Sequence, residues 1–177
     1  DRDFKKAREI AAPLVQLAPN SPLVLQLAGA SEYQLGALPQ AENLLSQAVK
    51  LAPGLPMATA LLARLYVRSG QPDRALETLQ PALAAAEPAA EMLLIAGEAH
   101  LLAGNPEQAD QAFARAAQIA PNSARTRTAV ALNQIGKGKA TEGLTELESI
   151  SSKDSGTSAD LALVASHLRR HDLAKAT

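Results

Sequence analysis

The sequence contains no cysteine and no tryptophan, and only two tyrosines and two phenylalanines occur among its 177 residues. The lack of cysteine excludes disulfides, cysteine-based zinc sites and cysteine nucleophiles from this stretch of chain. The scarcity of aromatic rings argues against a groove for carbohydrate or single-stranded nucleic acid. Such sites commonly use aromatic platforms, on which one stacked base is worth about 1–3 kcal/mol.

Neither sign of charge dominates, because 17 basic side chains stand against 18 acidic ones. Broad electrostatic attraction to nucleic acid or to an anionic membrane surface is therefore not expected. No apolar run approaches the roughly 18 residues that a membrane-spanning helix requires, and no signal peptide is recognisable. The hydrophobic share of 47% is that of a folded protein rather than a disordered one.

An internal period of 34 residues organises what the sequence does contain. Glycine recurs at this interval, and two columns of alanine keep the same spacing. The members are Gly36, Gly70, Gly104 and Gly138, then Ala7, Ala41, Ala75 and Ala109, then Ala48, Ala82 and Ala116. A 34-residue period with small residues at fixed phases is typical of tetratricopeptide helix pairs. We therefore expect an all-α fold, a right-handed superhelical tetratricopeptide (TPR) solenoid.

The period divides the chain into a single array of helix pairs A and B, which we interpret as part of a longer protein. The predicted segments are an orphan helix B over 3–19, repeats over 22–53, 56–88 and 90–121, a degenerate repeat over 124–150 and a truncated repeat over 158–177. Each column glycine is expected to end helix A in the left-handed conformation. The pairs Asn20-Ser21 and Asn122-Ser123 are expected to cap the helices that follow them. Pro13 and Pro81 are expected to kink helix B or end it early.

The third repeat resembles the tetratricopeptide family at Gly97, Gly104, Ala109, Phe113, Ala116 and Pro121. A narrower resemblance rests on the strings ARLYVRSGQPDRALETLQPAL, AGEAHLLAGNPEQADQAFARAAQIAPNSARTRTAVAL and SADLALVASHLRRHDLAKA. They are similar to the TPR lipoproteins of the bacterial PEP-CTERM/exosortase system, which are associated with exopolysaccharide production and the sorting of PEP-CTERM proteins. This resemblance implies a cell-envelope or periplasmic location with an N-terminal lipid anchor outside this segment. A cytoplasmic location stays open as the alternative.

A repeat solenoid is usually a holding surface, so we expect a non-catalytic scaffold that binds a protein or peptide in its concave groove. The candidate binding residues are Tyr33, Gln34, Arg64, Arg68, Glu91 and Glu98. Further positions on the same predicted face are Met57, Leu101, Arg125, Leu132, Arg169 and Arg170. The alternative interpretation is that the two arginines pair with the glutamates of the next repeat, as charges on exposed helix faces often do.

Two other functions remain in view. Exposed repeat ends favour a self-assembling structural spacer within a larger TPR protein. A cytoplasmic regulatory or co-chaperone-like adaptor is the other alternative. The chaperone-tail clamp of some TPR domains uses Lys and Asn, whereas the matching positions here are Gln26, Ala30, Ala60 and Arg64. A clamp of that type is therefore not expected.

No enzyme, cofactor or metal site is expected. His167 and His171 are one helical turn apart, but Leu168 replaces the glutamate of the zinc-protease pattern and a third ligand is lacking. His100 occupies a phase where the family often has tyrosine, and we expect it to pack with one hydrogen bond. Residues 136–139, GKGK, lack the spacing of a phosphate loop and are expected to form a solvated turn.

Overall fold

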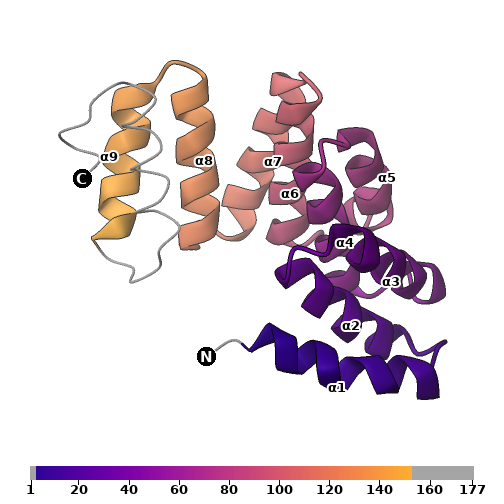
Figure 1. Cartoon of the computed structure of the whole chain (residues 1–177). Coiled ribbons are helices and arrows are strands. Elements are labelled where there is room, and N and C mark those ends of the chain that lie inside the picture. Colours follow the sequence, from indigo (N-terminus) through magenta and orange to yellow (C-terminus); the bar gives the residue numbers. More distant parts are fainter. Residues whose placement is uncertain (1–2, 153–177) are drawn as a thin grey trace. The chain divides into compact units, whose positions relative to one another are not determined.

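The structure is a computed structural model that describes residues 3–152. Within these residues all regular secondary structure is helical, and the nine helices alternate with short turns (Figure 1). Their bounds are α1 (Phe4–Leu17), α2 (Pro22–Gln34), α3 (Leu38–Leu51), α4 (Pro56–Arg68), α5 (Pro72–Leu83), α6 (Ala90–Leu102), α7 (Pro106–Ile119), α8 (Ala124–Gly136) and α9 (Ala140–Ser151). The predicted repeat over 158–177, the histidine pair His167 and His171, and Arg169 and Arg170 lie outside the described residues.

The four column glycines follow the ends of α2, α4, α6 and α8, and each has the predicted left-handed conformation. Their φ angles are 78°, 70°, 76° and 84°, in the left-handed region that a side chain disfavours. After each glycine, a backbone N–H bonds back to a carbonyl five residues earlier, as from Gln71 to Tyr66 at 2.9 Å and from Asn105 to His100 at 2.8 Å. This closing bond belongs to the Schellman turn, so the glycine column sets every A-to-B connection in the described part.

The other local predictions met mixed outcomes. Ser123 accepts a hydrogen bond from the amide of Thr126 at 3.4 Å and so caps α8, but Ser21 forms no side-chain cap to α2. The helix α1 continues four residues beyond Pro13 to Leu17, the repeat phase at which α3 and α7 also end. The helix therefore does not end early at Pro13, and the alternative expectation of a kink there stays a prediction. By contrast α5 stops at Leu83, two residues after Pro81 and two short of that phase.

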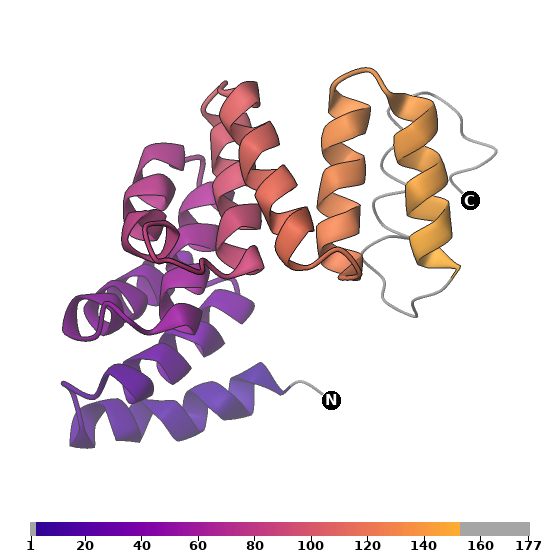
Figure 2. The same ribbon diagram turned by 180° about the vertical axis from the view of Figure 1, so that it is seen from behind.

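The described residues form two compact units, the first running to Pro88 and including Glu98–Asn105, the second comprising Ala89–Gly97 and the residues from Pro106 onward. In the first unit α2 packs against α1, α3 and α4, and α4 packs against α3 and α5 (Figures 1 and 2). In the second unit α8 lies between α7 and α9. Neighbouring A helices therefore make one layer of the first unit, while α1, α3 and α5 make the other.

Close helix packing depends on the small residues that share one phase. A β-carbon added to Gly29 would lie 2.7 Å from Cγ of Leu45, so no larger residue fits there without movement. Alanine at the same phase, Ala63 and Ala131, is completely buried. Small residues at this phase therefore allow helix A to approach helix B closely. None of the described helices is both long enough and apolar enough to cross a membrane.

Candidate protein-binding face

Tyr33 and Arg68 meet across the layer of A helices. Tyr33 lies near the end of α2 and Arg68 ends α4, and the guanidinium carbon of Arg68 is 5.8 Å from the centroid of the tyrosine ring. This distance permits a cation–π interaction, which at an exposed site is worth about 0.5–1 kcal/mol. The surface of α2 and α4 around this contact, with Arg64 and Glu98, is called the helix-A face below.

Arg64 lies one helical turn before Arg68 on α4, so both guanidinium groups extend from the same side of the helix. Glu98 of α6 belongs to the same compact unit as Arg64. Burial raises the pKa of the Glu98 carboxyl although its side chain still reaches solvent, and the charge of Arg64 opposes this rise. The predicted pairing of Arg64 with Glu98 stays a prediction.

The beginning of the same two helices is apolar and open to solvent. Leu23, Leu27 and Met57 are 64%, 46% and 60% exposed. Such a cluster of exposed large apolar side chains commonly marks a binding surface. Sequence reasoning singled out Met57 but missed both leucines. The signal was present, because Leu23 stands 34 residues before Met57 and therefore shares its phase.

The helix α2 also carries two glutamines, Gln26 and Gln34. Gln34 is exposed at the C-terminus of the helix, next to Tyr33. The side-chain oxygen of Gln26 is buried and accepts no hydrogen bond from any described residue. A buried acceptor without a donor is costly, so this atom lowers the stability of the fold.

The second unit carries a smaller set of predicted residues. Arg125 of α8 and Glu91 of α6 form an ion pair with an N–O distance of 3.5 Å. Each of these side chains is about half exposed, so the pair adds little stability. Leu132 of α8 is 40% exposed. Four of the six predicted residues thus belong to the helix-A face, Gln34 flanks it, and Glu91 belongs to the second unit.

Among the described residues, no cluster of three His, Cys, Asp or Glu side chains is placed to hold a metal ion. The Nδ1 atom of His100 is buried without a hydrogen-bond partner, so the predicted side-chain bond is wrong. Glu32 and Tyr66 stand at the phase of His100 in the two preceding repeats, and each forms a side-chain hydrogen bond. The partner of Glu32 is Arg8, and the partner of Tyr66 is Glu42. His100 instead has the apolar Leu76 at the matching position and gains no such partner.

The predicted GKGK turn holds one ion pair. Gly138 has a φ of 84°, and the ammonium of Lys137 donates to the carboxylate of Asp110. Asn133 donates to the other carboxylate oxygen of Asp110 at 2.6 Å. These bonds hold the pKa of Asp110 below its usual value, and they give Lys137 a structural role.

Comparison with known proteins supports the fold. A family model described as tetratricopeptide repeat matches residues 61–124. A crystal structure of a thermophilic TPR protein of Thermus thermophilus is 22% identical, with a TM-score of 0.79 over 88% of this chain and 86% of that one. A TPR protein from Parabacteroides merdae is 14% identical, with a TM-score of 0.85 over 98% and 68%. No curated protein sequence matches.

A third solved structure has a similar fold. The TPR protein YrrB, described as having an unusual peptide-binding site, is 16% identical, with a TM-score of 0.63 over 96% of this chain and 88% of that one. At these identities the likeness concerns the fold alone. The predicted all-α solenoid of tetratricopeptide helix pairs is thus shown, and this fold is the one that TPR proteins use as a protein-interaction scaffold.

Proposed function

We propose that the helix-A face binds an extended or helical segment of a partner protein and that the chain is a non-catalytic scaffold. The observation that carries this proposal is the joint exposure of an apolar cluster and a cationic end on neighbouring helices. Leu23, Leu27 and Met57 offer apolar surface, while Arg68 lies beside Tyr33. No carboxylate among the described residues forms an ion pair with Arg68.

These chemical groups define the segment that fits. Its apolar side chains would cover the leucines and Met57, and an aspartate or glutamate carboxylate would accept from Arg68. Arginine suits this task because its planar group can bind a carboxylate through two parallel hydrogen bonds. We therefore expect an amphipathic acidic peptide.

A peptide-display selection on the folded chain tests this function without a known partner. We expect selected sequences that combine apolar residues with Asp or Glu, and we expect their affinity to fall with added salt. The double variant Tyr33→Ala with Arg68→Ala should lose binding by roughly tenfold or more, as expected when an anchoring pair is truncated. The matched control is Arg115→Ala, since Arg115 is exposed on α7 in the second unit. Selected peptides that bind both variants equally well would contradict the assignment.

The cellular setting is proposed on the sequence resemblance alone. It places the partner in a bacterial envelope system for exopolysaccharide production or PEP-CTERM protein sorting, with a periplasmic, lipid-anchored parent protein. Affinity capture from envelope extracts, with the wild type and the Tyr33→Ala/Arg68→Ala variant compared, tests this setting separately from the peptide selection. Capture of only cytoplasmic proteins would count against the envelope while leaving the binding face intact.

Self-association is a second candidate, favoured by one stripe on α1. Ile10, Leu14 and Leu17 lie on one side of this helix and are 55%, 37% and 81% exposed. A stripe of this kind can stack on an apolar surface of a second copy. Sedimentation velocity should then show oligomers that disappear in the variant Ile10→Glu with Leu17→Glu. A monomer at all concentrations would remove this candidate.

A further inference from the structure

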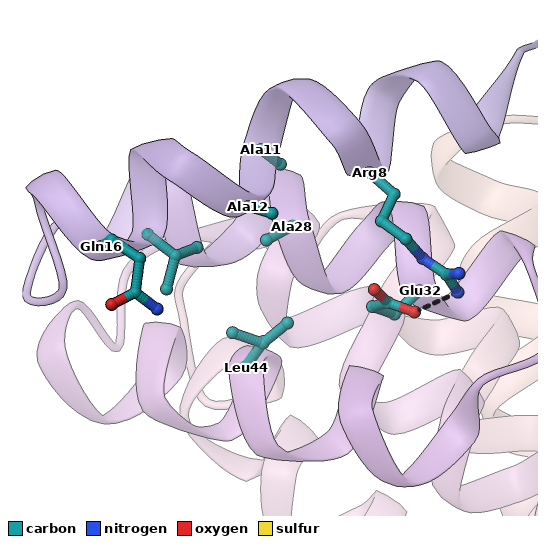
Figure 3. Close-up of a pocket in the computed structure, with 8 residues that line it drawn as sticks. Arg8, Ala11, Ala12, Gln16, Ala28, Glu32 and Leu44 are labelled. Carbon is teal, nitrogen blue, oxygen red and sulfur yellow. Dashed lines mark hydrogen bonds and ion pairs between the residues drawn. The ribbon is translucent and has the colours of Figure 1, made fainter.

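A hollow of about 210 Å³ is lined by side chains of α1, α2 and α3 (Figure 3). This hollow belongs to the other side of the first unit from the helix-A face, since both α1 and α3 are B helices. Ala11 and Val15 of α1, Ala28 of α2 and Leu44 of α3 supply its apolar walls. Arg8 and Glu32 stand at one end, where their side chains form an ion pair at 2.6 Å (Figure 3).

The next repeat has larger side chains at three of the corresponding positions, although Leu44 is replaced there by the smaller Thr78. Adding 34 to the residue numbers turns Ala11 into Leu45, Ala28 into Leu62 and Glu32 into Tyr66. These three larger residues are buried, with 0%, 4% and 4% of their surface exposed. The hollow therefore occupies space that two isobutyl groups and a phenol ring fill in the following repeat. The protein's own repeat shows what kind of group this space accepts.

Tyr66 shows how a phenol is held at this position. Its hydroxyl donates to Oε1 of Glu42 at 3.3 Å and accepts from the guanidinium of Arg74 at 2.7 Å. The guanidinium carbon of Arg74 also lies 4.1 Å from the centroid of the ring. One carboxylate and one guanidinium thus satisfy the hydroxyl, while apolar side chains surround the ring.

The hollow also offers one carboxylate and one guanidinium to an incoming phenol, but from other phases: Glu32 stands at the phase of Tyr66 and Arg8 at that of Glu42. The carboxylate of Glu32 can accept from a hydroxyl, and the guanidinium of Arg8 can donate to it. Glu32 is the less exposed partner, at 15% against 44% for Arg8. We propose that this hollow is a docking site for a tyrosine side chain of a partner protein, separate from the helix-A face.

A similar depression in the second unit has different chemistry and serves as a contrast. It measures about 280 Å³, and Val130 and Gln134 line it at the phases of Ala28 and Glu32. Its wall carries Glu146 at the phase of Leu44, and Arg127 donates to that carboxylate at 2.6 Å. This wall has a charged residue where the first hollow has the apolar Leu44, whereas the ion pair of the first hollow stands only at one end. The proposal is therefore confined to the first hollow.

The experiment uses 4-methylphenol, toluene and N-acetyltyrosinamide as probes on the chain with labelled methyl groups. We expect 4-methylphenol and N-acetyltyrosinamide to shift the NMR resonances of Ala11, Ala28 and Leu44. Toluene should bind roughly 3–10-fold more weakly than 4-methylphenol, because it lacks the hydroxyl. The variant Glu32→Gln keeps the shape of the side chain and removes its charge. It should reduce the difference in affinity between 4-methylphenol and toluene.

Filling the hollow supplies the decisive variant. Ala11→Leu with Ala28→Leu installs the residues that the next repeat carries, so we expect a melting temperature equal to or above that of the wild type and loss of probe binding. Val130→Leu, the matched change in the second unit, should leave binding intact.

Several results would overturn the proposal. Unshifted Ala11 and Ala28 methyl groups at millimolar probe, or binding that survives in the filled variant, would remove the site. Equal affinity for toluene and 4-methylphenol would make it a general apolar cavity. Binding of 4-methylphenol without N-acetyltyrosinamide would show that a tyrosine attached to a chain cannot enter. Contacts between these methyl groups and residues 153–177 in the free protein would identify an internal occupant instead.

Discussion

Gly97 and Phe113 approach so closely that a β-carbon on the glycine would lie 2.5 Å from Cε1 of the phenylalanine ring. Phe113 is 3% exposed, so the ring has little room in which to move. The same relationship joins Gly29 to Leu45, both of which lie 68 residues earlier in the chain. A small residue on helix A facing a large one on helix B is therefore a repeated packing unit.

We predict that Gly97→Ala destabilises the protein by about 1–3 kcal/mol, because overpacking a tight core forces side chains and backbone to shift. Urea unfolding measures this loss. Gly54→Ala is the control, since Gly54 has open space around the added carbon and an ordinary φ. Equal stabilities of the two variants would contradict the packing argument.

Replacement of Gly70 tests backbone conformation apart from packing. Its φ is 70°, and nothing lies within 4 Å of an added β-carbon. Gly70→Ala should cost about 1–2 kcal/mol from the left-handed conformation alone. Gly70→Asn should cost less, because asparagine adopts this conformation more readily. Thermal unfolding of both variants decides the matter, and an Asn variant as unstable as the Ala variant would refute the explanation.

The hydroxyl of Tyr66 provides a test of the buried polar contact between α3, α4 and α5. Tyr66→Phe leaves Glu42 and Arg74 without their shared partner, so we expect a loss of about 1 kcal/mol in the free energy of unfolding. Tyr33→Phe is the matched control, because the Tyr33 ring contacts Arg68 without a hydroxyl bond among the described residues. Chemical denaturation of both variants should show a loss only for the first.

Asp110 should contribute to the pH dependence of stability in acid. Hydrogen bonds from Lys137 and then from Asn133 lower the pKa of Asp110 below the usual 3.8. A lowered folded-state pKa stabilises the protein above the unfolded value and loses this effect as pH falls through the folded value. The stability advantage of the wild type over Asp110→Asn should therefore shrink below about pH 4. Urea unfolding across this range measures it, and a constant difference would rule out the linkage.

Glu98 should make the folded state less stable as pH rises, which is the opposite of the effect of Asp110. Burial raises its pKa above the usual 4.5 despite the charge of Arg64. A raised carboxyl pKa means that ionisation disfavours the folded state once the pH rises above the unfolded value. Glu98→Gln should then gain stability relative to the wild type as pH increases from acid toward neutral. A gain at neutral pH no larger than that in acid would contradict this sign.

Local features followed the sequence closely, because their causes are local. Left-handed turns at the four column glycines require only a residue without a β-carbon. At Pro13 the helix does not end early, which shows the limit of such reasoning. The helix continues because the cost of one proline can be outweighed by tertiary packing, and Ala11 of the same helix is 1% exposed.

The candidate site was only partly predictable. The repeat phase placed Tyr33, Arg64, Arg68 and Glu98 on one face, and the structure adds the contact between Arg68 and Tyr33. The exposure of Leu23 and Leu27 could not be read from hydrophobicity, since a leucine on an amphipathic helix is usually assigned to the core.

By itself the 34-residue period determined the helix pairs, their glycine turns and the close contacts of small residues, because each depends on spacing along the chain. Only the tertiary structure decided which spaces the side chains fill. Ala11 and Ala28 look like ordinary small residues in the sequence. They become the walls of a hollow because packing joins residues from three helices, and the volume left over depends on all of them together.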